Sequence, residues 1–186
     1  MLNLPNQLTM LRVLVIPLLV IVFYLPWEWH YFASGALFGI AALTDLLDGY
    51  LARRLKLETP FGAFLDPVAD KLIVAVALVL LLEQNASALF AIPAMVIIGR
   101  EIVVSALREW MAELGSRTSV AVSHIGKVKT VMQMVSIVIL LMFNPDTFPW
   151  FQYLGLVLLY IAAVLTLWSM VIYLKAAWPE FIRRSE

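Results

Sequence analysis

Four aspartates lie between residues 44 and 71, in a chain whose flanking segments are strongly apolar. Asp45 and Asp48 belong to one expected helix. Gly49 and Ala52, which have almost no side chain, share their face, because the four positions span roughly 100° of a helix circumference. Ionisable side chains are costly within a bilayer, so this face predicts a functional site.

A second acidic stripe follows directly in the sequence. Gly62, Asp66 and Asp70 recur at four-residue steps, which places them on one face of the next expected helix. The link between Arg53 and Gly62 is eight residues long. So short a connection predicts antiparallel neighbouring helices whose acidic stripes face each other at similar depth.

The four facing carboxylates are expected to bind hard divalent cations. Without basic partners they would repel one another and take up protons. Mg²⁺ and Mn²⁺ prefer oxygen ligands, and magnesium often completes its coordination shell with substrate phosphate. Arg53 would offer that phosphate a planar guanidinium, and the small residues would let a ligand approach the backbone. Helix capping at an interface is the less favoured alternative, because caps occupy helix ends and do not form two facing stripes.

The composition is that of an integral membrane protein. The 186 residues are 63% hydrophobic and 14% charged, with a mean hydropathy of +0.93, whereas soluble domains average about 45–50% apolar and about 25% charged residues. The absence of cysteine excludes disulfides and thiolate metal sites. Six segments predict spanning helices in a single all-α membrane domain: about 8–27, 32–54, 62–82, 88–108, 125–143 and 150–174.

The distribution of lysine and arginine predicts the orientation in the membrane. With six spans both termini lie on one side, and all 13 lysines and arginines then fall on or toward that side. The three opposite connections carry Glu28, Glu83 and Asp146 and no lysine or arginine. We therefore expect cytoplasmic termini and a cytoplasmic site. The amino terminus lacks the pattern of a cleaved signal peptide, and the net charge of zero gives no reason to expect a nucleic-acid partner.

The acidic segment resembles the complete signature of a known family. Its fixed positions are Asp45, Asp48, Gly49, Ala52, Arg53, Gly62, Asp66 and Asp70. The residue types and their spacing, including the eight-residue gap, are similar to those of the CDP-alcohol phosphotransferases. The resemblance implies six spans, a homodimer, and two divalent cations, Mg²⁺ or Mn²⁺, at the cytoplasmic side. It also implies transfer of a phosphatidyl or similar group from a CDP-linked donor to an alcohol, with release of CMP.

The same resemblance implies a role for each position. The metal ligands would be Asp45, Asp48, Asp66 and Asp70. Asp70 would also act as general base toward the acceptor hydroxyl, with Asp66 beside it in the catalytic pair. The residues that contact CDP-diacylglycerol would be Thr44, Asp48, Gly49, Ala52, Arg53 and Gly62. For Thr44 the alternative is a hydrogen bond to the backbone of its own helix.

Basic residues in the fourth and fifth expected spans predict a phosphorylated acceptor. The candidate ligands are Arg100, Arg108, His124, Lys127 and Lys129. By helical rise Arg100 lies roughly 12 Å deeper than Arg108, at a depth similar to that of Asp45. Glu101 and Glu109 are the candidate partners of the two arginines. A neutral acceptor such as serine would not need so many cations. For Lys129 alone, a positive-inside anchor is the alternative.

Further segments resemble one branch of the family, the bacterial phosphatidylglycerophosphate synthases: NQLTMLRVLVIP, GREI, GKVKTVMQ, LREWMAELG and AAVLTLWSM. This resemblance implies CDP-diacylglycerol and sn-glycerol 3-phosphate as substrates, in the bacterial cytoplasmic (inner) membrane. Inositol phosphate, serine and phosphatidylglycerol remain alternative acceptors within the family. Outside it, a divalent-cation transporter is disfavoured, because the sequence shows no internal repeat and its carboxylates crowd one side of the membrane.

Two further charged residues carry expectations. The segment NLPNQLTMLR is interpreted as a short interfacial helix, with Pro5 in its first turn and Arg12 reaching lipid headgroups. Lys71 is expected to snorkel toward the interface or to pair with a carboxylate of the site.

Overall fold

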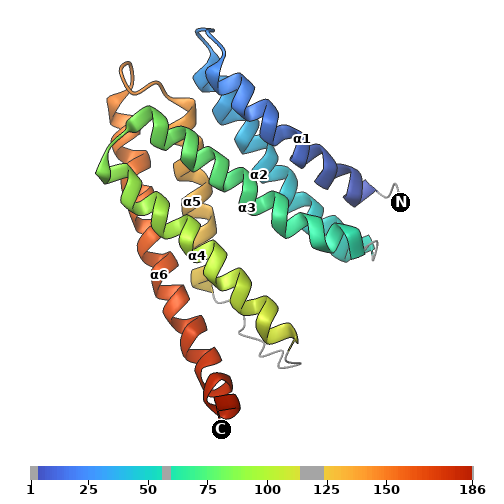
Figure 1. Cartoon of the computed structure of the whole chain (residues 1–186). Helices are drawn as coiled ribbons and strands as arrows, with labels where there is room; N and C mark the ends of the chain where they lie inside the picture. Colours follow the sequence, from blue (N-terminus) through green and yellow to red (C-terminus); the bar gives the residue numbers. More distant parts are fainter. Residues whose placement is uncertain (1–3, 56–59, 114–123, 186) are drawn as a thin grey trace.

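The computed structural model describes residues 4–55, 60–113 and 124–185, and every regular element in these ranges is an α-helix (Figure 1). Side chains are described within them except at 4–9, 46–61, 63, 112–113, 124–127, 176–177 and 179–185. The helices are α1 Leu4–Tyr24, α2 His30–Leu55, α3 Pro60–Asn85, α4 Ala88–Glu113, α5 His124–Met142 and α6 Pro149–Ser185. The expected all-helical fold is therefore confirmed for this part of the chain.

Three of the helices have a proline in their first turn. Pro60 and Pro149 are the first residues of α3 and α6, and Pro5 lies in the first turn of α1, where a missing backbone N–H leaves no helical bond unmade. The amino-terminal segment is not a separate interfacial helix as predicted. It is the first part of α1, because no residue after Pro5 breaks the helix before Pro17, which is itself accommodated within it.

Two of the helices contain segments long and apolar enough to cross a membrane by length and composition, Ala88–Met111 and Pro149–Lys175. Two shorter apolar helical segments are Met10–Tyr24 and Val128–Met142. Large apolar side chains such as Ile102 and Val157 are exposed on the outer faces, which suits contact with lipid rather than water. The six predicted spans remain a prediction beyond these segments.

The helices converge at one end and separate toward the other (Figure 1). The connections α1–α2, α3–α4 and α5–α6 gather at the upper left of that view, because successive helices run in opposite directions. α2 and α3 run antiparallel, as predicted. Among the described residues, α3 packs chiefly on α1, and α2 packs on α1 and α5, whereas α2 and α3 contact each other at fewer positions. The described parts of the two acidic helices are thus positioned mainly by their neighbours.

The apolar core fills the converging end. Its fully buried large side chains are Leu19, Phe38, Leu78, Leu81, Ile97, Ile137, Leu140, Leu141 and Leu159, which come from all six helices. Small residues let the backbones approach, as is common between membrane helices. A Cβ built on Gly35 of α2 would lie 2.5 Å from the Cβ of Met142 in α5. Ser136 of α5 donates a hydrogen bond of 2.7 Å to the carbonyl of Gly155 in α6.

We expect Gly35→Ala to destabilise the protein by about 1–3 kcal/mol, because the added methyl group meets the backbone as well as the side chain of Met142. Gly99→Ala is the matched control. A Cβ on Gly99 meets no described atom within 4 Å, so this change should be neutral or stabilise α4 by up to about 1 kcal/mol. Thermal unfolding in detergent measures both, and equal midpoints for the two variants would contradict the close approach of α2 and α5.

Candidate active site

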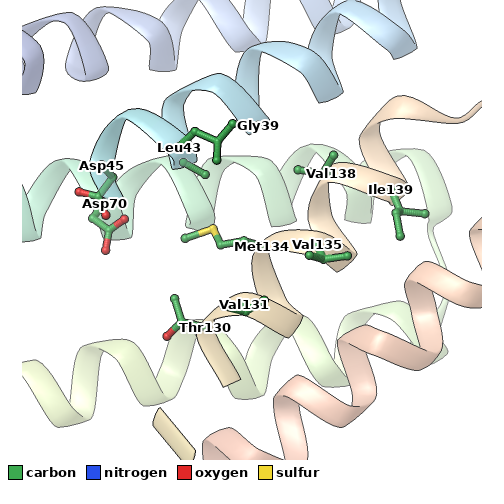
Figure 2. Close-up of a pocket in the computed structure, with 11 residues that line it drawn as sticks. Gly39, Leu43, Asp45, Asp70, Thr130, Val131, Met134, Val135, Val138 and Ile139 are labelled. Atoms are coloured by element: carbon green, nitrogen blue, oxygen red, sulfur yellow. The ribbon is translucent and has the colours of Figure 1, made fainter. Parts of the chain in front are cut away.

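One pocket lies between α2 and α5 and reaches α3 (Figure 2). It has a volume of about 410 Å³, within the range of small-molecule sites. Most of its lining is apolar: Gly39, Ala42, Leu43, Val131, Met134, Val135, Val138 and Ile139. Asp45 of α2 and Asp70 of α3 lie side by side at one end of the pocket (Figure 2). The pocket is therefore amphipathic, with two carboxylates at the end of an apolar trough.

The structure brings two of the four predicted aspartates together. Asp70 lies within electrostatic range of Asp45, so the expected approach of the acidic stripes is confirmed for this pair. Asp66 lies one turn before Asp70 on α3 and is partly buried, but it does not line the pocket. Gly62, two turns before Asp70, is buried.

The rest of the predicted donor site lies outside the described side chains. Asp48, Gly49, Ala52 and Arg53 belong to the last turns of α2, whose helical backbone continues to Leu55. The prediction that Asp48, Gly49 and Ala52 share a face with Asp45 therefore stays a prediction, as do the contacts of Arg53. The Thr44 hydroxyl donates a hydrogen bond of 2.7 Å to the carbonyl of Ile40. The backbone-bonded alternative for Thr44 is thus confirmed.

Asp45 has a basic partner that the sequence prediction missed. Nη1 of Arg12, on α1, lies 2.7 Å from Oδ1 of Asp45. Arg12 is only 3% exposed, so the prediction that it reaches lipid headgroups was wrong. The signal was present in the sequence. Arg12 continues the stripe formed by Ile16, Leu19 and Phe23, all of them buried, at helical spacing.

Two of the predicted acceptor ligands, Arg100 and Arg108, contact residues of α6. Arg100 is buried. It donates a hydrogen bond of 2.9 Å to the carboxylate of Glu101 and one of 3.0 Å to the hydroxyl of Ser169 on α6. Arg108 is exposed and donates a hydrogen bond of 2.9 Å to the hydroxyl of Tyr173, also on α6. Both arginines therefore point toward α6 rather than toward the acidic pair. The side chains of His124 and Lys127 lie outside the described residues.

Lys129 lies closer to the acidic pair. It is 5% exposed. Its ammonium group donates a hydrogen bond of 2.9 Å to Oε1 of Glu101, the same oxygen that Arg100 contacts. The predicted partnership of Arg100 with Glu101 is confirmed, and Lys129 shares that carboxylate. For Arg108, the described hydrogen bond goes to Tyr173 instead.

A second, smaller cavity of about 70 Å³ adjoins the first and shares Asp70, Thr130 and Met134 with it. The remaining lining residues are Lys71, Val74, Glu101, Lys129 and Gln133. The ammonium of Lys71 donates a hydrogen bond to the Ser105 hydroxyl on α4, so this hydroxyl takes the place of the predicted carboxylate partner. Asp70 thus stands at the junction of an apolar pocket and a polar, lysine-lined cavity.

Among the described side chains, no group of three or more histidine, cysteine, aspartate or glutamate residues is placed to hold one metal ion. The pair that faces the common pocket, Asp45 and Asp70, supplies carboxylate oxygens, which are the donors that Mg²⁺ and Mn²⁺ prefer. The donor chemistry therefore fits a hard divalent cation. The side chain of Asp48, the other predicted ligand on α2, falls outside the described residues.

Comparisons with known proteins agree with the signature. The family model for CDP-alcohol phosphatidyltransferase matches residues 2–168. A protein of Pseudomonas fluorescens is 58% identical over 179 residues, covering 96% of this chain and 91% of its own length. A protein of Escherichia coli K12 is 57% identical over 180 residues, covering 97% of each. Both carry the name CDP-diacylglycerol–glycerol-3-phosphate 3-phosphatidyltransferase.

Glu101→Gln should destabilise the protein by about 3 kcal/mol or more, because two buried cations lose the carboxylate that they share. Glu109→Gln, on the same helix and exposed, is the control and should change the free energy of unfolding by less than about 0.5 kcal/mol. Denaturant or thermal unfolding of both variants in the same detergent measures the difference. A wild-type midpoint for Glu101→Gln would contradict the shared ion pair.

Proposed function

Because the chain belongs to the CDP-alcohol phosphatidyltransferase family, we propose that it transfers the phosphatidyl group of CDP-diacylglycerol to sn-glycerol 3-phosphate. The products are phosphatidylglycerophosphate and CMP, and the enzyme serves phospholipid biosynthesis. The observation that carries this assignment is the identity of 57–58% with relatives of that name over 96–97% of the chain. The name of these relatives also favours glycerol 3-phosphate over the other acceptors considered.

The larger pocket suits a donor with a lipid tail and a charged head. The apolar side chains of α2 and α5 would contact an acyl chain, and the acidic end would face the pyrophosphate region. Asp48, Gly49, Ala52, Arg53 and Gly62 are the proposed contacts of the cytidine nucleotide. Arg53 would bind the donor phosphates through its guanidinium.

Asp70 is the proposed general base. Its position between the two cavities supports this role, because the acceptor hydroxyl and the donor phosphate must meet next to the base. The acceptor oxygen forms a bond to the phosphorus that carries diacylglycerol, and the pyrophosphate P–O bond to CMP breaks. The hydroxyl proton passes to the Asp70 carboxylate. Asp66, one turn away, is proposed to complete the catalytic pair.

Two divalent cations, Mg²⁺ or Mn²⁺, are the proposed cofactors, held by Asp45, Asp48, Asp66 and Asp70. When bound, they supply positive charge for the negative oxygens that develop during phosphoryl transfer. The carboxylates of Asp45 and Asp70 support the proposal, since two like charges that line the same end of one pocket favour the binding of cations.

The acceptor is proposed to enter through the polar cavity. Lys129 and Lys71 line it and would contact the phosphate of sn-glycerol 3-phosphate, with His124 and Lys127 nearer the start of α5. Arg100 and Arg108 would contribute by holding α4 against α6 through their hydrogen bonds to Ser169 and Tyr173.

The protein is a membrane protein, as its apolar helices and its family indicate. We further propose a single catalytic domain with six spans in the bacterial cytoplasmic membrane. Both termini and the acidic site would face the cytoplasm, which the one-sided distribution of lysine and arginine supports. A homodimer is proposed on the family resemblance alone.

Asp70→Asn should lower kcat by roughly 10²-fold or more, because the proton acceptor and one negative charge are lost together. The fold should persist, because the substitution is nearly isosteric. CMP release under saturating substrates and cation measures the loss, with Asp146→Asn in an exposed connection as the control. A wild-type kcat for Asp70→Asn would rule out Asp70 as the base.

The proposed reaction is tested by product analysis of the purified protein in detergent. CDP-diacylglycerol and Mg²⁺ or Mn²⁺ are supplied with glycerol 3-phosphate, inositol 1-phosphate, serine or phosphatidylglycerol in separate reactions. We expect CMP and a new phospholipid with glycerol 3-phosphate only. Turnover with another acceptor would overturn the acceptor assignment, and CMP in none of the reactions would overturn the transfer.

A further inference from the structure

Arg12 brings a third helix into the acidic site. It lies on α1, outside the α2–α3 segment that carries the aspartates, and its Nη1 is 2.7 Å from Oδ1 of Asp45. The side chain is only 3% exposed. A guanidinium is costly to remove from water, so its burial requires a compensating partner. Asp45 provides that compensation, and the contact is therefore specific rather than a consequence of the helix leaving the membrane.

The contact leaves Asp45 accessible to the pocket. The Asp45 side chain remains 35% exposed while one of its oxygens contacts Arg12. A carboxylate has two oxygens and about four acceptor sites, so the arginine occupies part of its capacity and leaves the rest for a ligand. A side chain held at one oxygen also loses rotational freedom, and its orientation toward the pocket is fixed before any substrate arrives.

Arg12 also acts on the second carboxylate. Asp70 experiences the charges of both Asp45 and Arg12. The two aspartates repel each other across the pocket, and in a poorly solvated site this repulsion is weakly screened. A buried cation beside the pair offsets part of it.

We propose that Arg12 is a positioning residue of the transferase. It fixes the carboxylate of Asp45 and offsets the repulsion between Asp45 and Asp70, so that both groups face the pocket together. Arg12 does not touch the reacting atoms, and the consequence for turnover rests on the proposed function. The ion pair itself does not rest on it and is tested separately.

The kinetic test compares Arg12→Gln with Arg12→Lys. Arg12→Gln removes the charge and should lower kcat roughly tenfold or more at saturating substrates and cation, because Asp45 is no longer held in place. The apparent KM for glycerol 3-phosphate should stay within about twofold, since Arg12 lies at the Asp45 end of the site. Arg12→Lys keeps a cation in reach and should recover most of kcat.

Ser136→Ala is the matched structural control. It removes a buried interhelical hydrogen bond between α5 and α6, away from the acidic pair, and should lower the unfolding midpoint without changing kcat. Three results would overturn the positioning role: a wild-type kcat for Arg12→Gln, equal losses in the glutamine and lysine variants, or the same loss in Ser136→Ala.

A double-mutant cycle on stability tests the ion pair without any assay of activity. The unfolding midpoints of Arg12→Gln, Asp45→Asn and the double variant are measured in detergent without added divalent cation. We expect the unfolding midpoint of the double variant to fall by less than the sum of the decreases in the two single variants, because the two residues are coupled. Additive losses would overturn the pair. If the wild-type protein made no CMP, the proposed function would fail, and this cycle would still decide whether Arg12 holds Asp45.

Discussion

The site depends on keeping two carboxylates of like charge close together in an apolar part of the protein. Among the residues that the structure describes, α2 and α3 each contact α1 at more positions than they contact each other. α1 therefore helps to hold the two carboxylates in place. It packs on both helices and supplies Arg12 to the acidic pair. The amino-terminal helix is thus a structural part of the site, although it contributes no aspartate.

A second electrostatic group stabilises the opposite wall. Glu101 on α4 accepts hydrogen bonds from Lys129 on α5 and from Arg100, the preceding residue of α4. Arg100 also donates a hydrogen bond to Ser169 on α6. Three helices are therefore connected through one carboxylate next to the polar cavity. Each buried cation in this wall has an anionic partner, which is the condition for charge to persist in a medium of low dielectric constant.

The sequence was sufficient for the helical fold, the family and the approach of Asp45 to Asp70, because these depend on helical spacing and on the short link between the two helices. It was not sufficient for the arginines. When most surfaces of a helix are apolar, periodicity does not show which face turns inward. Arg100 could be placed at the right depth but not in the right direction, since the rotation of α4 depends on its packing against α6. Arg12 was misread because a basic residue near a terminus usually serves as an interfacial anchor.

The position of Asp70 between an apolar pocket and a polar cavity has a kinetic consequence. In the proposed arrangement, the donor would reach Asp70 by lateral diffusion within the lipid layer, and the acceptor would reach it from the aqueous medium. The lipid donor would not need to leave the bilayer, and the lipid product would return to it. The reaction rate would then follow the mole fraction of donor in the membrane surface and the bulk concentration of the acceptor.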